Sequence, residues 1–222
     1  MDKIVTTIAH FRQFGFLQIF TIYLRYLIGG AFVVAAFGMG KFNNQELLIS
    51  RPGTPIEQLQ PIEQFFRVMA TSGLYWQFIG WSQVIAGILL MTQRFAKAGA
   101  ALFFGMILNI FIITISYNFK GTPVVTGLML LAATYLIIWD FDSFQYMFRK
   151  PVPNPVNAQT LRIADRPYWT IVGVLMFMLI LFCVVFKLNT LYQLGGCFVI
   201  GLVSFILFFT TFRRKGTQAL SA

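Results

Sequence analysis

The sequence offers very few residues that could hold a metal ion or a haem. Histidine occurs once among 222 residues, at His10, outside the long apolar runs. A haem held within a membrane through histidines is therefore not expected, nor is a zinc site built from several cysteine and histidine ligands. The P-loop, GxSxG and HExxH motifs are absent as well. Without these nucleotide-binding and hydrolase motifs, the sequence implies no metal and no catalytic residue.

Cysteine is nearly as scarce, with Cys183 and Cys197 in two neighbouring apolar runs and no CxxC pair. This spacing gives no support to thioredoxin-type chemistry. Counted from the short turn near residues 187–191, the two thiols lie at broadly similar depth. Two alternatives stay open. A disulfide across the hairpin would require Cα atoms within about 7 Å, whereas free thiols buried among apolar neighbours are inert.

Charged residues make up only 11% of the chain, against 58% hydrophobic residues. Soluble domains carry about 25% charged residues, so this composition indicates a protein whose solvent is the lipid bilayer. The formal net charge is +10, but the cations lie in short segments between apolar runs, where they set the topology. No basic stripe runs along a polar domain, so nucleic acid is not an expected partner.

The long apolar runs predict six membrane-spanning helices, since a span needs about 20 mostly apolar residues. They cover residues 16–40, 75–92, 97–117, 122–140, 168–187 and 190–212. The first run is longer than a secretory h-region of about 7–15 residues and contains Arg25, so an uncleaved span is expected. With the N-terminus inside, 11 lysines and arginines fall on the cytoplasmic side and five on the outer side. Both termini are therefore expected in the cytoplasm.

The predicted fold is an all-α integral membrane protein in two parts. A four-helix bundle occupies residues 1–147, and a two-helix membrane hairpin occupies residues 168–213. Residues 148–167 contain three prolines within five positions, which predicts a stiff cytoplasmic linker between the parts. Residues 214–222 form a cytoplasmic tail.

A short amphipathic helix is predicted at residues 61–70, between the first two spans. Ile62, Phe65, Phe66 and Met69 follow the i, i+3, i+4, i+7 spacing of one helical face, after a proline at position 61. Such a helix is expected to lie on the outer leaflet. The alternative is that Phe65 and Phe66 belong to a lid over a ligand entrance.

Arg25 and Asp140 are the charged residues set deepest among apolar neighbours. Three interpretations of Arg25 are open: a charge within the bilayer, a side chain that extends to the cytoplasmic headgroups, or an ion pair with Asp140. The fourth span ends with Asp140 at the same level as Arg25, so we expect the pair. Its role would be structural, because a buried pair specifies helix register more than it adds stability.

Gln83 and Asn109 lie at similar depth in two adjacent antiparallel spans. An interhelical hydrogen bond between them is the simpler expectation. The alternative is a polar floor of a ligand pocket that opens outward. The further residues of that candidate pocket are Lys41, Tyr117 and Asn118, with Trp76 and Thr122 as walls.

Small residues recur at four-residue spacing, which lets helices approach closely. The pairs are Ala31/Ala35, Ala36/Gly40 and Ala101/Gly105. We interpret them as packing positions. Gly29–Gly30 is the one candidate for a helix break of the kind found in transporters.

The first four spans resemble the DoxX-like family of small bacterial inner-membrane proteins, which are four-helix bundles. The resemblance covers roughly residues 20–147 and begins with "LRYLIGGAFVVAAFGMGKF" at residues 24–42. It continues with "GWSQVIAGILLMTQRFAKAGAAL" and "FKGTPVVTGLMLLAATYLIIWD". In the first of these stretches, the family's pattern is matched by Arg25, Gly29, Ala35, Gly38 and Lys41. Family members commonly carry a glutamate where this chain has Gln83, and the last two spans are an addition to the family's core.

The resemblance implies a multi-pass protein of the bacterial inner membrane with an association with redox chemistry or quinone. Together with the residues themselves, it leaves three candidate functions. The first is an accessory subunit of a membrane complex, linked to quinone or thiol redox chemistry, with a membrane-protein partner or a second copy. The second is a quinone-reactive oxidoreductase subunit with its pocket in the bundle. The third is a small-molecule or lipid transporter. No cofactor is firmly implied, and quinone is the one to consider.

Overall fold

The computed structural model describes residue 8 and residues 10–42, 54–141 and 167–218. Within these ranges the chain is helical and contains no β-strand. Besides one 3₁₀ turn, η1 (Ile56–Gln58), seven α-helices are described there: α2 (Gly15–Gly38), α3 (Pro61–Thr71), α4 (Leu74–Met91), α5 (Ala96–Ser116), α6 (Thr122–Trp139), α8 (Pro167–Val185) and α9 (Thr190–Gln218). The predicted all-α class is confirmed.

All of these α-helices except α3 are long and apolar enough to cross a membrane, so the prediction of six spans is confirmed. In α9 the candidate span covers Thr190–Thr210, and the helix continues to Gln218. A helix satisfies every backbone N–H and C=O within its own segment, which is why apolar runs of this length take this form in lipid. The linker predicted at residues 148–167 falls almost entirely outside the described residues.

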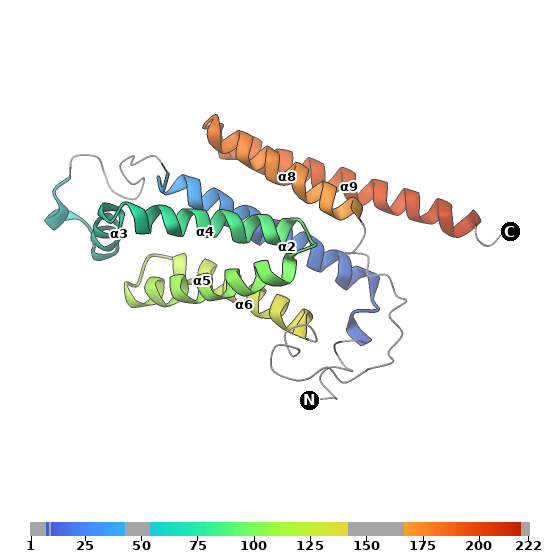
Figure 1. Ribbon diagram of the computed structural model, residues 1–222, viewed down its shortest axis with the longest axis horizontal. Helices are drawn as coiled ribbons and strands as arrows, with labels where there is room; N and C mark the ends of the chain where they lie inside the picture. The colour runs from blue at the N-terminus through green and yellow to red at the C-terminus, as the bar shows by residue number, and fades with distance from the viewer. Residues whose placement is uncertain (1–7, 9, 43–53, 142–166, 219–222) are drawn as a thin grey trace.

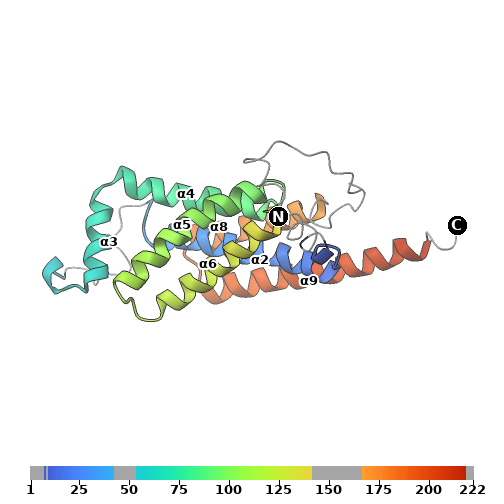
Figure 2. The same cartoon turned by 90° about the horizontal axis from the view of Figure 1, so that it is seen from below.

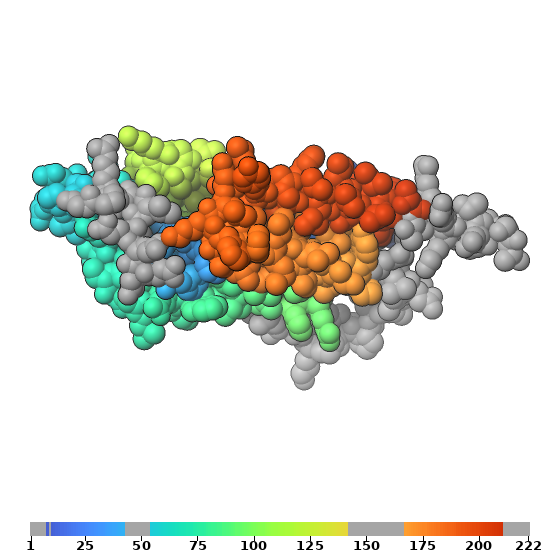
Figure 3. Space-filling model, turned by 90° about the horizontal axis from the view of Figure 1, so that it is seen from above, coloured from blue at the N-terminus to red at the C-terminus, as the bar shows by residue number. Residues whose placement is uncertain are grey.

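The spans form three layers of paired helices (Figure 1). The helices α2 and α4 lie in the middle, with α5 and α6 on one side and α8 and α9 on the other. Figure 3 shows the hairpin of α8 and α9 spread over α2, which remains visible only in a small area. In α2, 61% of the apolar window is buried, against 22% in α6 and in α9. The first span is therefore the axis around which the other helices pack.

Glycines allow the central helices to approach closely. A Cβ atom on Gly87 in α4 would lie 2.7 Å from the carbonyl oxygen of Gly29 in α2. On α8, a Cβ atom on Gly173 would collide with the carbonyl oxygen of Met91. Helices in a membrane associate through such packing, because lipid tails are as apolar as the side chains. The possible break at Gly29–Gly30 does not occur, since α2 runs through both residues without interruption.

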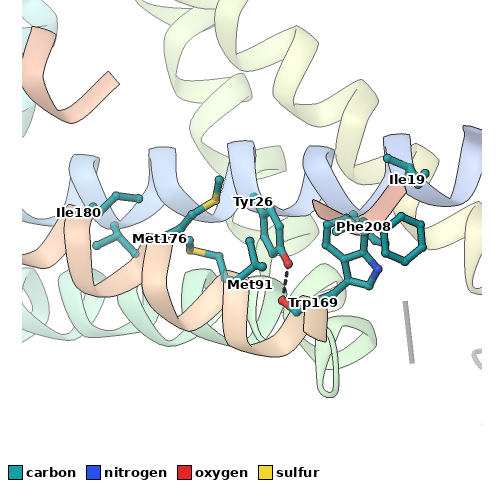
Figure 4. Close-up of a cluster of buried hydrophobic side chains, with 10 residues drawn as sticks. Ile19, Tyr26, Met91, Trp169, Met176, Ile180 and Phe208 are labelled. Atoms are coloured by element: carbon teal, nitrogen blue, oxygen red, sulfur yellow. Dashed lines mark hydrogen bonds between the residues drawn. The ribbon is translucent and has the colours of Figure 1, made fainter. Parts of the chain in front are cut away.

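Aromatic and sulfur-containing side chains fill the contact between α2 and the hairpin (Figure 4). Trp169, at the start of α8, is completely buried, and the hydroxyl of Tyr26 donates a hydrogen bond to its backbone carbonyl. The Trp169 ring packs against Phe208 in α9 with a centroid distance of 5.0 Å. The hairpin is thus held to the bundle by a packed core as well as by the chain.

The predicted amphipathic helix is present as α3, which runs crosswise to α4 at one end of the bundle (Figure 2). Glu63 Oε2 accepts a hydrogen bond of 3.0 Å from the backbone N–H of Gln60, which caps the first turn. Ile62 is buried, and its neighbours on the same face are partly covered. The opposite end of the bundle is formed by the start of α2, the turn between α4 and α5, and the end of α6.

Candidate functional site

Arg25 and Asp140 are in direct contact. Arg25 Nη2, in α2, lies 2.7 Å from Oδ2 of Asp140, which caps the C-terminal end of α6. Arg25 is 5% exposed and Asp140 is 1% exposed. The guanidinium is therefore buried together with its counter-ion. A buried pair of this kind tolerates little sliding of one helix along the other.

Gln93 completes this charged network, although it was not predicted from the sequence. Its Oε1 accepts a hydrogen bond of 2.9 Å from Arg25 Nη1. Gln93 belongs to the tight turn between α4 and α5 and adopts φ = 59°, a left-handed conformation that is uncommon for a residue with a side chain. This conformation directs a turn residue into the bundle. Turn chemistry alone would assign a glutamine at this position to the surface.

A polar cavity of about 230 Å³ opens beside the network. We call it the basic pocket, and define it by the charged or amide side chains that line it: Arg12, Gln18, Arg25, Gln93, Arg94, Lys97 and Asp140. Arg12 donates a hydrogen bond to the carbonyl oxygen of Trp139 at the end of α6, and its guanidinium lies 6.0 Å from the centroid of that indole. The pocket therefore joins the segment before α2 to α2, the α4–α5 turn and α6.

Lys41 and Gln83 form a second buried polar contact, at the α3 end of the bundle. Lys41 Nζ donates to Gln83 Oε1 at 2.6 Å and to the carbonyl oxygen of Ala35 at 3.3 Å, near the end of α2. The ammonium also lies 5.3 Å from the centroid of the Trp76 ring. Lys41 is 2% exposed, and among the described residues no carboxylate lies within 4.0 Å of it. Burial lowers the pKa of Lys41 to about 8, because the charged form loses its hydration.

The aromatic residues of α3 cover this end of the bundle. Phe65 packs on Tyr117 at a centroid distance of 5.5 Å, and Phe66 packs near Trp76 at 6.4 Å. Asn118, next to Tyr117, is exposed in a turn with φ = 46°. Of the predicted pocket residues, Lys41 and Gln83 are therefore in contact, while Tyr117 and Asn118 lie at the rim beneath α3.

Asn109 does not belong to this group. It is exposed on α5, whereas Gln83 is buried, and no hydrogen bond joins its side chain to any described residue. The expected bond between Gln83 and Asn109 is therefore absent. The reason is that Lys41 occupies the Gln83 amide oxygen and α5 turns its Asn109 side away from α4. Ala101 and Gly105, expected to pack within the bundle, are exposed on α5 as well.

Cys183 in α8 and Cys197 in α9 are both free thiols. Cys183 is buried and Cys197 is partly covered. Cys197 lines an apolar groove of about 670 Å³ between α2 and α9, together with aromatic side chains such as Phe20 and Phe205. This groove contains almost no polar surface that could orient a reacting group. The disulfide considered from the sequence is not formed.

No protein-family model matches the chain, and no curated protein or solved structure is significantly similar to it. The class of the protein is therefore shown by its own structure, through the six long apolar helices. The chain is a multi-span helical membrane protein. Two buried polar contacts mark the opposite ends of its bundle, and among the described residues no group of His, Cys, Asp or Glu is arranged to hold a metal ion.

Proposed function

We propose that this protein is a non-catalytic subunit of a bacterial inner-membrane assembly, as its resemblance to the DoxX-like family implies, and that it assembles through the exposed face of α5. The observation that supports this proposal is the exposed position of Asn109 on α5. Its amide is exposed seven residues before the end of α5 at Ser116, which is about 10 Å along the helix. A polar group that faces hydrocarbon without a partner costs free energy, and a second helix removes that cost.

The surroundings of Asn109 suit a close helix contact. Ala101, Gly105 and Asn109 follow one another at four-residue spacing and are all exposed. A Cβ atom on Gly105 would meet nothing within 4 Å, so the face is open at its centre. Small residues at this spacing let two backbones approach to the distance at which polar side chains can bond across the contact.

The occupant that fits this face best is α5 of a second copy of the chain. A carboxamide carries both a donor and an acceptor, so two Asn109 side chains related by a two-fold axis satisfy each other. Such an isologous contact needs no complementary residue type elsewhere. A homodimer is then the unit that joins a larger membrane complex.

The experiment is a native mass of the protein in mild detergent. We expect multiples of the 25.3 kDa chain for the wild type, and a shift towards the monomer in Asn109→Leu and Gly105→Leu. Thr134→Val is the matched control, because Thr134 is exposed on α6 and its hydroxyl already bonds to Leu130 of its own helix. A monomeric wild type, or a dimer that both variants leave intact, would contradict the proposal.

A second candidate function is quinone binding, which is supported by the buried contact of Lys41 with Gln83. A lysine without a carboxylate within 4.0 Å, among the described residues, can donate a hydrogen bond to a neutral carbonyl oxygen. The covering aromatics Phe65 and Phe66 would then lie over the ring. Under this alternative, Gln83→Leu reduces quinone-dependent turnover of the assembly and leaves its native mass unchanged. Unaltered turnover would remove it from consideration.

We also propose that the Arg25–Asp140 end of the bundle is cytoplasmic, with both termini on that side. The support is the bias of 11 lysines and arginines against five.

A further inference from the structure

We propose that the basic pocket binds a phosphate group, either the headgroup phosphate of an anionic lipid or a free phosphate. This inference concerns a ligand site and does not depend on the assembly role of α5.

The lining of the pocket is strongly cationic. Among the described residues that line it, Arg12, Arg25, Arg94 and Lys97 are cations and Asp140 is a carboxylate. Asp140 is bound to Arg25 Nη2 at 2.7 Å and balances that guanidinium. Among the described residues, no carboxylate lies within 4.0 Å of Arg94 or Lys97. An anion entering the cavity therefore finds an excess of positive charge close to low-dielectric walls.

A buried hydrogen-bond donor in the wall of the pocket lacks an acceptor in good geometry. Gln93 is 8% exposed, its Oε1 is used by Arg25, and its Nε2 makes no hydrogen bond of good geometry with a described residue, although the side chain is close enough to the Tyr26 hydroxyl to interact with it. Such a donor gains from an acceptor that lies in better geometry. Gln93 also retains an uncommon positive φ. Strained backbone next to a poorly paired buried donor is a pattern found at ligand sites.

The pocket lies where four elements end, which is the depth of lipid headgroups. It is bordered by Arg12 ahead of α2, by the α4–α5 turn, by the first residues of α5 and by Asp140 after α6. The start of α5 adds the positive end of a helix dipole. A volume of about 230 Å³ has room for several waters at about 30 Å³ each, and hence for a tetrahedral oxyanion. Basic pockets between helices on the cytoplasmic side bind lipid headgroups of this class.

The test compares the thermal midpoint of the full-length protein in lipid nanodiscs. One series replaces part of the phosphatidylcholine with phosphatidylglycerol, and a second adds inorganic phosphate to phosphatidylcholine discs, with chloride at equal ionic strength as reference. Arg94→Gln/Lys97→Gln removes two exposed cations from the pocket. Lys120→Gln/Lys187→Gln removes two exposed cations at the opposite end of the bundle and is the matched control. Gln93→Asn shortens the side chain that carries the buried Nε2 donor and leaves the net charge of the protein unchanged.

We expect phosphatidylglycerol to stabilise the wild type and the control variant. In the pocket variant, the half-saturating amount of phosphatidylglycerol should rise roughly 25-fold, about fivefold for each cation removed. Gln93→Asn should weaken the response with no change of net charge. If inorganic phosphate reproduces the effect, the ligand is a free phosphate. If pocket and control variants respond alike, or phosphatidylcholine stabilises as strongly as phosphatidylglycerol, the proposal is overturned.

Discussion

Arg25 in α2 and Asp140 at the end of α6 lie 2.7 Å apart, although 115 residues separate them along the chain. Neither side chain reaches solvent to any useful extent, at 5% and 1% exposure. Their contact spans the bundle at the end where the α4–α5 turn also inserts Gln93. One ion pair and one amide thus connect three elements of the four-helix bundle.

Removing one partner of this pair should destabilise the protein. Asp140→Asn leaves the Arg25 charge buried without its counter-ion, and breaking a buried pair in this way costs about 3–5 kcal/mol. We expect a lower thermal midpoint in detergent. The double exchange Arg25→Asp/Asp140→Arg should recover part of the loss, since it restores the attraction in the opposite sense. A double variant no more stable than Asp140→Asn would argue against the pairing as the source of the effect.

Burial of Lys41 should make stability depend on pH. Its pKa falls from 10.5 to about 8 in the folded protein, so between these values the unfolded chain binds more protons than the folded one. Stability therefore rises with pH across that window, by at most about 1.4 kcal/mol for each pH unit. Compared with Lys41→Met, the wild type should gain thermal stability between pH 8 and pH 10. Lys120→Met, at an exposed lysine, should follow the wild-type curve. Parallel curves for the wild type and Lys41→Met would refute this.

The glycine contact between α2 and α4 should tolerate no added methyl group. In Gly87→Ala the new Cβ would lie 2.7 Å from Gly29 O and from Val33 Cγ2. Overpacking of this kind costs about 1–3 kcal/mol, even though alanine favours the helix more than glycine does. Gly195→Ala is the matched control, because a Cβ at Gly195 in α9 meets nothing within 4 Å. We expect a lower thermal midpoint for the first variant only, and equal midpoints would show that the helices can separate at no cost.

The proposed orientation can be measured with single cysteines in a Cys183→Ala/Cys197→Ala background. Lys120→Cys, in the turn between α5 and α6, should react with a membrane-impermeant maleimide in intact cells. Arg94→Cys, in the turn between α4 and α5, should react only after permeabilisation. Both positions are exposed, so access of the reagent to the turn is equal. The reverse pattern would place the basic pocket on the outer side.

Much of the architecture was predictable because a membrane span in lipid must be a long apolar helix. The spans could therefore be counted from the long apolar runs in the sequence. The predicted limits of most spans also agree with the ends of the helices, because charged and turn residues interrupt the apolar runs there. The contact of Arg25 with Asp140 could also be predicted, because these are the two charged residues set deepest among apolar neighbours and their charges have opposite signs. The helix α3 followed from the spacing of its apolar side chains.

Other parts of the candidate sites could not be derived from a linear pattern. Gln93 was not anticipated because its orientation depends on a left-handed turn conformation that a glutamine gives no reason to expect. Asn109 was assigned to the wrong partner because depth in the membrane does not specify which side of α5 faces α4. Rotation about a helix axis is set by packing. Because apolar residues surround α5 on nearly every side, its sequence carries little information about which side faces α4.

The distance along the chain between Arg25 and Asp140 also has a consequence for biosynthesis. The ribosome must add 115 further residues after Arg25 before Asp140 exists, which takes roughly 6–23 s at about 5–20 residues per second. During that interval the first span is already made while its counter-ion is not. Insertion of α2 into the membrane and its final packing in the bundle are therefore separate events. The ion pair can form only after the fourth helix of the bundle has been synthesised.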